Sequence, residues 1–312
     1  MPGGEPTDLD VVVIGGGVAG LTAGLFAARY GCATLVLEST IPGGHLVNVE
    51  KIEDFPGFPE GIPGFDLCPL VQEQAEQHGA RFELAEVEAL ERDGDVWRVQ
   101  TGQGSHRTRA VIVAAGSRPG ALAVPGEARL AGRGISHCAS CDGPLFRGKV
   151  VGVVGDGSAA LQEAITLAGY AARVIAFTRG PGFTGQDTYL RRLAEQPQIE
   201  PRHGVVVTEV LGDGVVSGVR LRDVQTAAES QVDLAALFVY AGQEPNTAFL
   251  RDLLPLAADG RVPTDSLMRT GLPGLFAAGD CRAGSLHHAI TAAGDGATAA
   301  IAAHRFLEQR RS

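Results

Sequence analysis

The segment 138–143, Cys-Ala-Ser-Cys-Asp-Gly, holds the residues of this chain best suited to chemistry. Two cysteines two residues apart can cycle between a dithiol and a disulfide without a large movement of the backbone. Asp142 follows the second cysteine directly, so its carboxyl group can supply or accept the proton that such a cycle needs. Cys138 and Cys141 are therefore a candidate redox pair with Asp142 as a candidate acid, although an aspartate there can also serve as a plain turn or cap residue.

The same cysteine spacing also occurs in zinc sites, which need two further ligands at suitable spacing. His137 adjoins Cys138 and cannot easily point at the same metal, and the other three cysteines are scattered singly. An odd total of five cysteines does not make a disulfide framework. In a reducing compartment, a close pair of this kind favours a catalytic or metal-binding role over a structural one.

The composition is that of an α/β protein of moderate size. The 312 residues are enough for two domains that each have a core of their own. The 43 glycines and 45% hydrophobic content suit a fold in which many tight turns join strands to helices. The net charge of -10 argues against nucleic-acid binding, because no basic stripe is present to neutralise phosphates.

Membrane and targeting signals are not evident in the sequence. No apolar run approaches the roughly 20 residues that a membrane-spanning helix needs. The first ten residues are polar and acidic, and they lack the basic and apolar regions of a signal peptide. We therefore expect a cytoplasmic protein without a membrane partner.

The N-terminal region has the pattern of a dinucleotide-binding βαβ unit. The apolar run Asp10–Ile14 predicts a buried parallel strand, and the glycine turn Gly15–Gly20 follows at once. A helix over 21–30 and a strand over 33–37 are expected next, and Glu38 ends that strand, 18 residues after the last glycine. Such glycines let the backbone approach a pyrophosphate at a helix N-terminus, and the acid receives a ribose hydroxyl.

A second unit of the same kind follows about 140 residues later. A strand is predicted over 149–154, a turn over 155–160, a helix over 161–170 and a strand over 173–177. The two units predict an α/β fold with two Rossmann-like, three-layer dinucleotide-binding domains, the second inserted in the first. The candidate residues of the second nucleotide site are Gly155, Gly157, Ser158, Ala159 and Arg179.

The breakpoints between these domains are predicted at glycine- and proline-containing stretches. One is the end of the apolar run 111–119, and the other is the stretch 240–247. Beyond them, a short apolar strand ends in Gly279 and Asp280, and a helix is expected over 289–307. Gly294 and Gly296 disfavour the first turns of that helix.

Together these stretches resemble the low-molecular-weight thioredoxin reductase family over nearly the whole chain. The resemblance is carried by Gly15 to Gly20, Gly43-Gly44-His45-Leu46, Glu53-Asp-Phe-Pro-Gly57, Cys138 to Gly143, the turn at Gly155, Tyr240-Ala-Gly, Ala277-Ala-Gly-Asp280 and Ala289-Ile-Thr-Ala-Ala-Gly294. It implies an FAD domain made of residues 1–117 and 245–312, with an NAD(P)H-like domain carrying the cysteines over 118–244. It also implies a homodimer and a large domain rotation between two working states.

The resemblance also implies which residues contact FAD. The ADP half is assigned to Gly15, Gly17, Ala19, Gly20 and Glu38. The region of the flavin and the ribityl chain is assigned to Gly43, Gly44, His45, Leu46, Asp54, Val87, Gly116, Gly279, Asp280, His288, Ala289 and Ile290. The last three open a helix whose positive N-terminal end would favour an anionic reduced flavin.

The implied mechanism gives the two cysteines different roles. Cys141 faces the flavin as a thiolate, Cys138 attacks the disulfide of a partner, and Asp142 protonates the departing thiolate. The partner implied is a thioredoxin-like protein or a small dithiol or disulfide.

The second nucleotide site departs from the family pattern. Family members normally carry a His-Arg-Arg…Arg cluster that grips the 2′-phosphate of NADPH, whereas only Arg179 remains here, with Gly180 and Thr184 in place of two arginines. Losing two charged hydrogen bonds costs on the order of 3–6 kcal/mol, or about 10² to 10⁴ in affinity. No acid ends this strand to favour NADH either. Arg191 and Arg192 can serve the phosphate or form a solvated helix face.

The expected flavin surroundings also differ from the family pattern. His45 replaces a glutamine, and Asp54 replaces an asparagine. Leu286-His287-His288 stands where an Arg-Gln pair is usual. These changes can tune the flavin potential, and the two histidines either titrate near neutral pH or lie exposed at the helix start. Cys281 is either a third redox thiol or a small buried residue.

Three functions compete on this evidence. The first is an NADPH-dependent disulfide reductase acting on thioredoxin. The second keeps FAD and the cysteine pair but uses another electron partner, such as ferredoxin, another flavin, or a dithiol with oxygen as acceptor. The third is a flavin-binding redox sensor without turnover. The missing arginines place the second ahead, and whether NADPH or NADH binds stays open.

Overall fold

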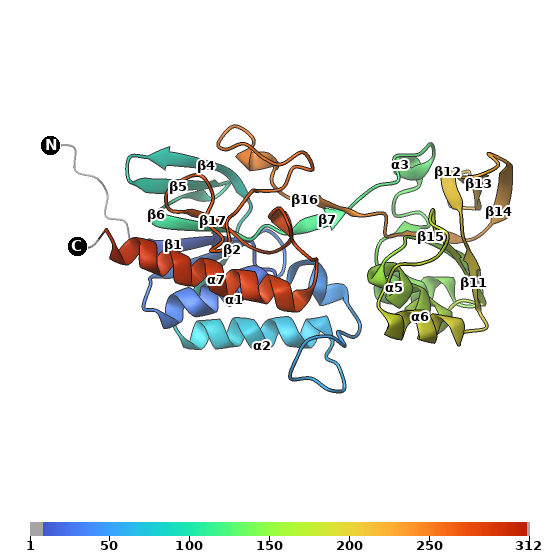
Figure 1. The fold of residues 1–312 in the computed structure, drawn as a ribbon, viewed down its shortest axis with the longest axis horizontal. Coiled ribbons are helices and arrows are strands. Elements are labelled where there is room, and N and C mark those ends of the chain that lie inside the picture. Colours follow the sequence, from blue (N-terminus) through green and yellow to red (C-terminus); the bar gives the residue numbers. More distant parts are fainter. Residues whose placement is uncertain (1–8, 311–312) are drawn as a thin grey trace. The chain divides into compact units, whose positions relative to one another are not determined.

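The chain folds into two compact units that are joined by two crossings (Figure 1). The computed structural model describes residues 9–310, so most of the polar N-terminal stretch lies outside the described residues. Unit 1 comprises Met1–Arg118 and Glu244–Ser312, and unit 2 comprises Pro119–Gln243. Strand β7 (Ser117–Pro119) pairs with strand β16 (Gln243–Pro245), so the two crossings run together as a two-stranded sheet.

Unit 1 is built on a mixed sheet with strand order β3-β2-β1-β6-β5-β4, and β17 also pairs with β6. The strands are β1 (Leu9–Ile14), β2 (Thr34–Glu38), β3 (Arg81–Leu84), β4 (Val87–Asp93), β5 (Val96–Thr101), β6 (Gly104–Val113) and β17 (Leu275–Ala277). The pairs that involve β1, β2, β3 and β17 are parallel, and β4, β5 and β6 form an antiparallel meander. The parallel strands are nearly continuous apolar runs because both faces are covered.

Three helices cover one face of this sheet: α1 (Val18–Arg29), α2 (Gly64–Gln77) and α7 (Ala289–Glu308). Helix α1 packs against both α7 and α2 (Figure 1). Apolar side chains of α1, α7 and the sheet form one core cluster. A second cluster lies on the opposite face, where Trp97 is fully buried as a packing residue.

Unit 2 has a parallel five-stranded sheet with an antiparallel three-stranded sheet beside it. The first has the order β11-β10-β9-β15-β8, and its strands are β8 (Ile135–Ser136), β9 (Val150–Val154), β10 (Arg173–Phe177), β11 (Ile199–Arg202) and β15 (Ala236–Val239). The second contains β12 (Val205–Leu211), β13 (Gly218–Asp223) and β14 (Glu229–Asp233). Helices α5 (Ser158–Ala168) and α6 (Asp187–Ala194) share one core cluster with the parallel sheet, and the antiparallel sheet shares another.

The predicted fold class, two Rossmann-like α/β domains, is confirmed, but the helices after the glycine turns begin earlier than the sequence pattern predicts. Helix α1 begins at Val18 and α5 begins at Ser158, each three residues ahead of the predicted start. Gly17 and Gly157 have extended backbones and cap these helices, so the turn passes directly into the helix. The first free N–H groups of each helix therefore belong to the glycine turn itself.

Two glycines set the distance between α1 and its neighbours. A Cβ atom at Gly20 would lie 1.8 Å from the carbonyl oxygen of Gly15, so only glycine lets the helix start this close to the strand. A Cβ at Gly296 would lie 2.1 Å from the carbonyl oxygen of Ala19, which is where α7 crosses α1. The glycines that lower helix propensity in α7 therefore have different roles, since a Cβ at Gly294 meets nothing within 4 Å.

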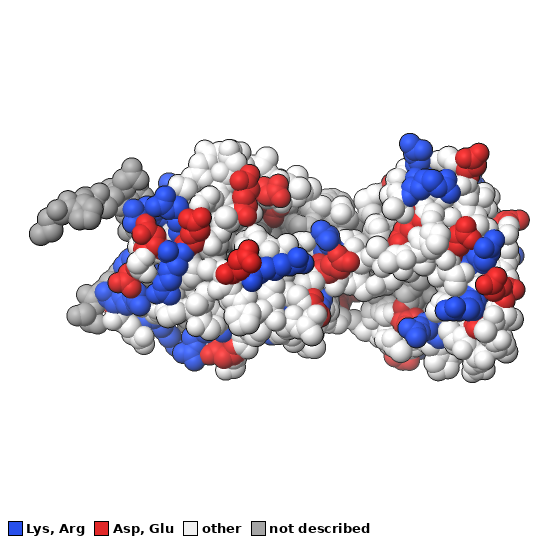
Figure 2. Space-filling view, turned by 90° about the horizontal axis from the view of Figure 1, so that it is seen from above, with Lys and Arg blue, Asp and Glu red and all other residues white. Residues whose placement is uncertain are grey.

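Within residues 9–310, no helix combines the length and apolar character that crossing a bilayer requires. On the face shown in Figure 2, basic and acidic side chains are interspersed, without a continuous basic stripe.

We expect Gly296→Ala to destabilise the protein by about 1–3 kcal/mol, because the new methyl group must push α7 away from α1. Gly294→Ala is the matched control in the same helix. It should be neutral or stabilising by up to about 1 kcal/mol, since alanine is the better helix former. Urea unfolding followed by circular dichroism measures both, and equal effects of the two substitutions would contradict the packing role of Gly296.

Candidate redox and dinucleotide sites

Cys138 and Cys141 are joined as a disulfide in unit 2, with their Cα atoms 5.3 Å apart. Cys138 caps the short helix α4 (Ala139–Asp142), and the backbone N–H of Cys141 donates to Cys138 Sγ at 3.1 Å. The hydroxyl of Ser140 lies 3.4 Å from the same sulfur. Cys138 is half-buried and Cys141 is exposed. The sulfur of Cys138 therefore has two polar neighbours within its own helical turn.

A partly buried hydrogen-bond network supports the start of α4. Glu163 on α5 accepts a hydrogen bond from the backbone N–H of Ala139 at 2.8 Å, and its same oxygen accepts one from the hydroxyl of Tyr240 at 2.8 Å. Burial, and the negative charge of Glu163 beside it, raise the pKa of Tyr240 far above its usual range. Tyr240 therefore stays protonated and remains a donor, so Glu163 fixes the helix that carries the cysteines.

Asp142 ends α4 directly after Cys141 and is half-buried. Its charge adds to the causes that raise the pKa of Tyr240, which brings Asp142, Glu163 and Tyr240 into one electrostatic group. The structure thus places a carboxyl group directly after the cysteine pair. Sequence reasoning did not find Glu163 or Tyr240 as members of this group, because their approach to α4 depends on how α5 packs. Among residues 9–310, no three His, Cys, Asp or Glu side chains gather as a metal site.

The first glycine turn of unit 1 fits the ADP half of a dinucleotide. Gly15 has a φ of +101°, and a Cβ at Gly17 meets nothing within 4 Å, which leaves the turn open above its backbone. Glu38 ends β2 and is buried, and one of its carboxylate oxygens accepts the N–H of Gly16 at 2.7 Å. The other oxygen accepts the N–H of Thr40 at 2.9 Å. A buried carboxylate is thereby held beside an open turn, as ribose recognition requires.

The second glycine pair lies beside this turn. Gly43 has a φ of +114°, and its N–H donates to the carbonyl of Gly16 at 2.7 Å. Gly44 begins the 3₁₀ helix η1 (Gly44–Asn48), which contains His45 and Leu46. A Cβ at Gly43 would lie 2.8 Å from that of Cys68, so the buried α2 residue Cys68 requires glycine here. The structure therefore brings residues 43–46 and the first turn together.

The start of α7 carries one of the two unusual histidines. His288 is the N-cap residue of α7, and its Nδ1 lies 3.1 Å from a carboxylate oxygen of Asp54. Both side chains are about 40% exposed, at 41% for the histidine and 37% for the aspartate. Ala289 and Ile290 form the first turn of the same helix. The predicted residues Asp54 and 288–290 thus lie together, although they are more than 230 residues apart in sequence.

The other histidine belongs to a cluster around Asp280. Asp280 lies in the 3₁₀ helix η4 (Gly279–Cys281), where Ser285 donates to it at 2.9 Å and His287 Nδ1 lies 3.4 Å away. Burial acts to raise the pKa of Asp280, but the hydrogen bonds and charge of His287, with Ser285 and Ser117, lower it overall. Asp280 is therefore held as a carboxylate at the end of β17.

Gly116 and Val87 are the remaining predicted cofactor residues, and Cys281 is the remaining candidate thiol. Gly116 follows β6 with a φ of +62°, so it lies at the same carboxyl edge as the other turns, and its carbonyl accepts the N–H of Asn246 at 3.0 Å. Val87 begins β4 and packs, half-buried, against the second core cluster. Cys281 is fully buried with its sulfur on the carbonyl oxygens of Val113 and Ala278, which is the environment of a packing residue.

The second glycine turn, in unit 2, contains an acid that the sequence analysis did not single out. Asp156 accepts a hydrogen bond from the hydroxyl of Thr178, which follows β10 directly. Arg179 is exposed beside it. Arg191 instead forms an ion pair with Asp187 at 3.0 Å along α6, which is the solvated-face arrangement. Strand β10 does not end in an acid, but the glycine turn places the carboxylate of Asp156 at the end of this strand.

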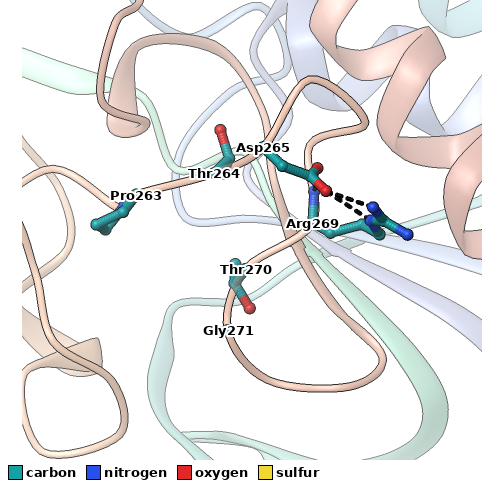
Figure 3. A pocket seen from close by; sticks show the side chains of 6 residues that line it. All are labelled: Pro263, Thr264, Asp265, Arg269, Thr270 and Gly271. Carbon is teal, nitrogen blue, oxygen red and sulfur yellow. Dashed lines mark hydrogen bonds and ion pairs between the residues drawn. The ribbon is translucent and has the colours of Figure 1, made fainter.

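Unit 1 also has a surface depression of about 470 Å³, and the residues that line it are not among the predicted site residues. It is lined by Pro263, Thr264, Asp265, Arg269, Thr270 and Gly271. Asp265 and Arg269 in this lining form an ion pair with each other (Figure 3), and hydrogen bonds from Arg269 lower the pKa of Asp265. The charges of Asp265 and Arg269 neutralise each other. None of the predicted redox or cofactor residues lines the depression.

Comparison with known proteins agrees with this geometry. A family model described as pyridine nucleotide-disulphide oxidoreductase matches residues 9–296. The chain is 37% identical to a thioredoxin reductase of Treponema pallidum over 97% of this chain and 98% of that protein. It is 39% identical to a thioredoxin reductase of Mycolicibacterium smegmatis over 96% of this chain and 97% of that protein. The crystal structure of Lactococcus lactis thioredoxin reductase in the FR conformation superposes with a TM-score of 0.94 at 34% identity, covering 96% of this chain and 99% of that one.

The chain therefore belongs to the pyridine nucleotide-disulphide oxidoreductase family. Within that family it is an FAD-dependent disulfide oxidoreductase of the thioredoxin reductase type.

We expect Glu163→Ala to destabilise unit 2 by about 1–3 kcal/mol, because it leaves the N–H of Ala139 and the hydroxyl of Tyr240 without their acceptor. Glu163→Gln keeps an acceptor oxygen and should cost less. Chemical unfolding monitored by circular dichroism measures both. A smaller loss for the alanine variant than for the glutamine variant would contradict the role of the carboxylate as an anchor.

The five cysteines should separate into two reactivity classes. Burial raises the pKa values of Cys68 and Cys281 to about 11, so these two thiols carry little thiolate at pH 8. Cys32 is also buried, which shields its sulfur from the reagent. After mild reduction, iodoacetamide at pH 8 should modify Cys138 and Cys141 rapidly and the other three slowly. Peptide mass spectrometry over time checks this, and rapid alkylation of Cys281 would restore it as a redox candidate.

Proposed function

We propose that this protein is a disulfide reductase that passes two electrons between FAD held by unit 1 and the Cys138–Cys141 pair of unit 2. From there the electrons go to the disulfide of a thioredoxin-like protein. The observation that carries the proposal is a disulfide at the start of a helix in the same chain as an open glycine turn with a buried acid. The full-length similarity to proteins named thioredoxin reductase supports it.

Unit 1 would hold FAD through the residues already described: the turns at 15–20 and 43–46, with Glu38, Asp54, Asp280 and the start of α7. When bound, FAD supplies a two-electron carrier. The chain's own contribution is to hold the carboxylate of Glu38 beside the turn, to keep Asp280 ionised, and to present the N-terminal end of α7. A small dithiol or disulfide is the alternative partner, and a homodimer is the assembly we propose.

The cysteines and Asp142 would then act in two exchange steps. The Cys138 thiolate attacks one sulfur of the partner's disulfide, a mixed disulfide forms, and the departing partner thiolate takes a proton from Asp142. Cys141 next attacks the Cys138 sulfur, which restores the internal disulfide and releases the second partner thiol. The hydrogen bond from the N–H of Cys141 to Cys138 Sγ supports Cys138 as the attacking thiolate. Leu145, which is 70% exposed four residues after Cys141, offers an apolar contact to the partner.

We propose that this chain does not favour NADPH as its electron donor. The ground for this is the segment that follows β10. Arg179 is the cation that remains there, with Gly180 and Thr184 at the other two positions. The donors left for the same core are NADH, ferredoxin, another flavin, or a dithiol with oxygen as final acceptor. A conventional NADPH-dependent reductase is the main alternative, and a redox sensor without turnover is a weaker one.

Anaerobic mixing of the purified holoenzyme with each donor tests the direction of electron supply. Under the proposal, NADPH bleaches the oxidised flavin absorbance slowly or not at all, while dithionite bleaches it fully. The dithionite-reduced protein then reduces thioredoxin disulfide. Bleaching by NADPH within seconds supports the conventional reductase. Rapid bleaching by a dithiol, followed by oxygen consumption once air is admitted, supports the oxidase.

Cys138→Ser and Cys141→Ser should each abolish reduction of thioredoxin disulfide while leaving FAD bound, because each removes one sulfur of the pair. Cys32→Ala, which removes a buried thiol outside the pair, is the control and should keep activity. Turnover measured with the insulin-coupled thioredoxin assay and flavin content measured by absorbance separate the two effects. Turnover that survives in Cys138→Ser would remove this cysteine from the mechanism.

A further inference from the structure

The carboxylate of Asp156 is fixed at the junction between the second glycine turn and strand β10. Its oxygen accepts the hydrogen bond of the Thr178 hydroxyl, and Thr178 is itself buried. Thr178 Oγ1 also accepts the N–H of Gly180 at 3.2 Å. The backbone carbonyl of Asp156 accepts the N–H of Thr184 at 2.8 Å. Thr178 thus holds the carboxylate of Asp156, and Thr184 holds the backbone of the same residue.

The register of the two sheets shows which residues are equivalent in the two units. In unit 1, Ile14 at the end of β1 pairs with Leu37 in β2, and in unit 2, Val154 at the end of β9 pairs with Phe177 in β10. The residue after each first strand then makes the same hydrogen bond. Gly15 N–H donates to the carbonyl of Leu37 at 2.7 Å.

The corresponding bond in unit 2 runs from Gly155 N–H to the carbonyl of Phe177 at 3.2 Å. Asp156 therefore occupies the place of Gly16, and Thr178 occupies the place of Glu38. In unit 1 the strand supplies the carboxylate and the turn supplies the donor. In unit 2 the turn supplies the carboxylate and the strand supplies the donor. A carboxylate is present at the same junction in both units, from opposite partners.

A carboxylate at this junction has a defined chemistry in dinucleotide-binding folds. It accepts hydrogen bonds from the hydroxyls of the adenosine ribose, whereas a 2′-phosphate at the same place needs arginine. A 2′-phosphate beside Asp156 would meet a like charge, with the single exposed Arg179 as the cation on the adjoining segment. Like-charge juxtaposition of this kind is how a site rejects a close analogue.

We propose that Asp156 is a specificity-determining residue that makes unit 2 a site for a nicotinamide dinucleotide with a free 2′-hydroxyl, NADH, and disfavours NADPH. This inference rests on the proposed function, since NADH would serve the same flavin and cysteine pair. The overall balance is that NADH loses a hydride to become NAD⁺, and one proton from solvent completes the reduction of a disulfide to two thiols.

Calorimetric titration of the oxidised holoenzyme with NAD⁺ and with NADP⁺ tests the assignment by binding alone. The wild type should bind NAD⁺ at least about tenfold more tightly than NADP⁺, a preference equivalent to about 1.4 kcal/mol. Asp156→Asn keeps an acceptor for Thr178 but removes the charge, so the preference should fall about tenfold. Asp213→Asn, which removes an exposed acid of the same unit in the turn after β12, is the control and should leave the preference unchanged.

A double variant separates the position of the carboxylate from the identity of the residue that carries it. Asp156→Gly alone should lose the preference for NAD⁺. Asp156→Gly combined with Thr178→Glu rebuilds the arrangement of unit 1 and should restore it. Equal or tighter binding of NADP⁺ by the wild type, absence of NAD⁺ binding, or an unchanged preference in Asp156→Asn would each overturn the inference.

The failure of this inference is distinguishable from failure of the proposed function. If dithionite-reduced protein reduces thioredoxin disulfide but NAD⁺ does not bind preferentially, only the nucleotide assignment is wrong. If dithionite-reduced protein leaves thioredoxin disulfide intact, the proposed function is wrong whatever the nucleotide titrations show.

Discussion

The close approach of Gly20 to the carbonyl of Gly15 is the constraint on which the arrangement of unit 1 depends. No side chain fits between them, so α1 starts directly over the end of β1 and its free N–H groups face the edge of the sheet. The parallel strands β1, β2, β6 and β17 end at that same edge. The turns that follow them therefore gather residues from distant parts of the sequence into one place. Gly296 extends the constraint to α7, whose start carries His288.

Both βαβ units could be predicted from the sequence because their signals are local. A buried parallel strand is a continuous apolar run, and a glycine turn with a following helix is a short pattern. Glu38 ends such a unit, and the cysteine pair is a short local motif of its own. The structure joins the cysteines and buries the glutamate. The helix starts differ by three residues from the pattern, because Gly17 and Gly157 already cap the two helices.

The residues that sequence reasoning missed all depend on tertiary pairing. Asp156 was passed over because the search was for an acid at the end of β10, whereas the register of β9 and β10 brings an acid to that end from the turn. Glu163 gave no signal on α5, since its role depends on the approach of α4 and Tyr240. The partners of His288 and His287 likewise come from elsewhere in the sequence, at Asp54 and Asp280. These contacts follow from packing, which no local pattern encodes.

Communication between the flavin and the cysteine pair is the central claim of this account. Anaerobic titration of the holoenzyme with dithionite, followed by flavin absorbance and thiol counting, tests it most directly. Flavin and disulfide each take two electrons, so full reduction of the wild type should need about two equivalents of dithionite, against about one for Cys138→Ser. A wild-type protein that is fully bleached by one equivalent, with the Cys138–Cys141 disulfide still intact, would contradict the account.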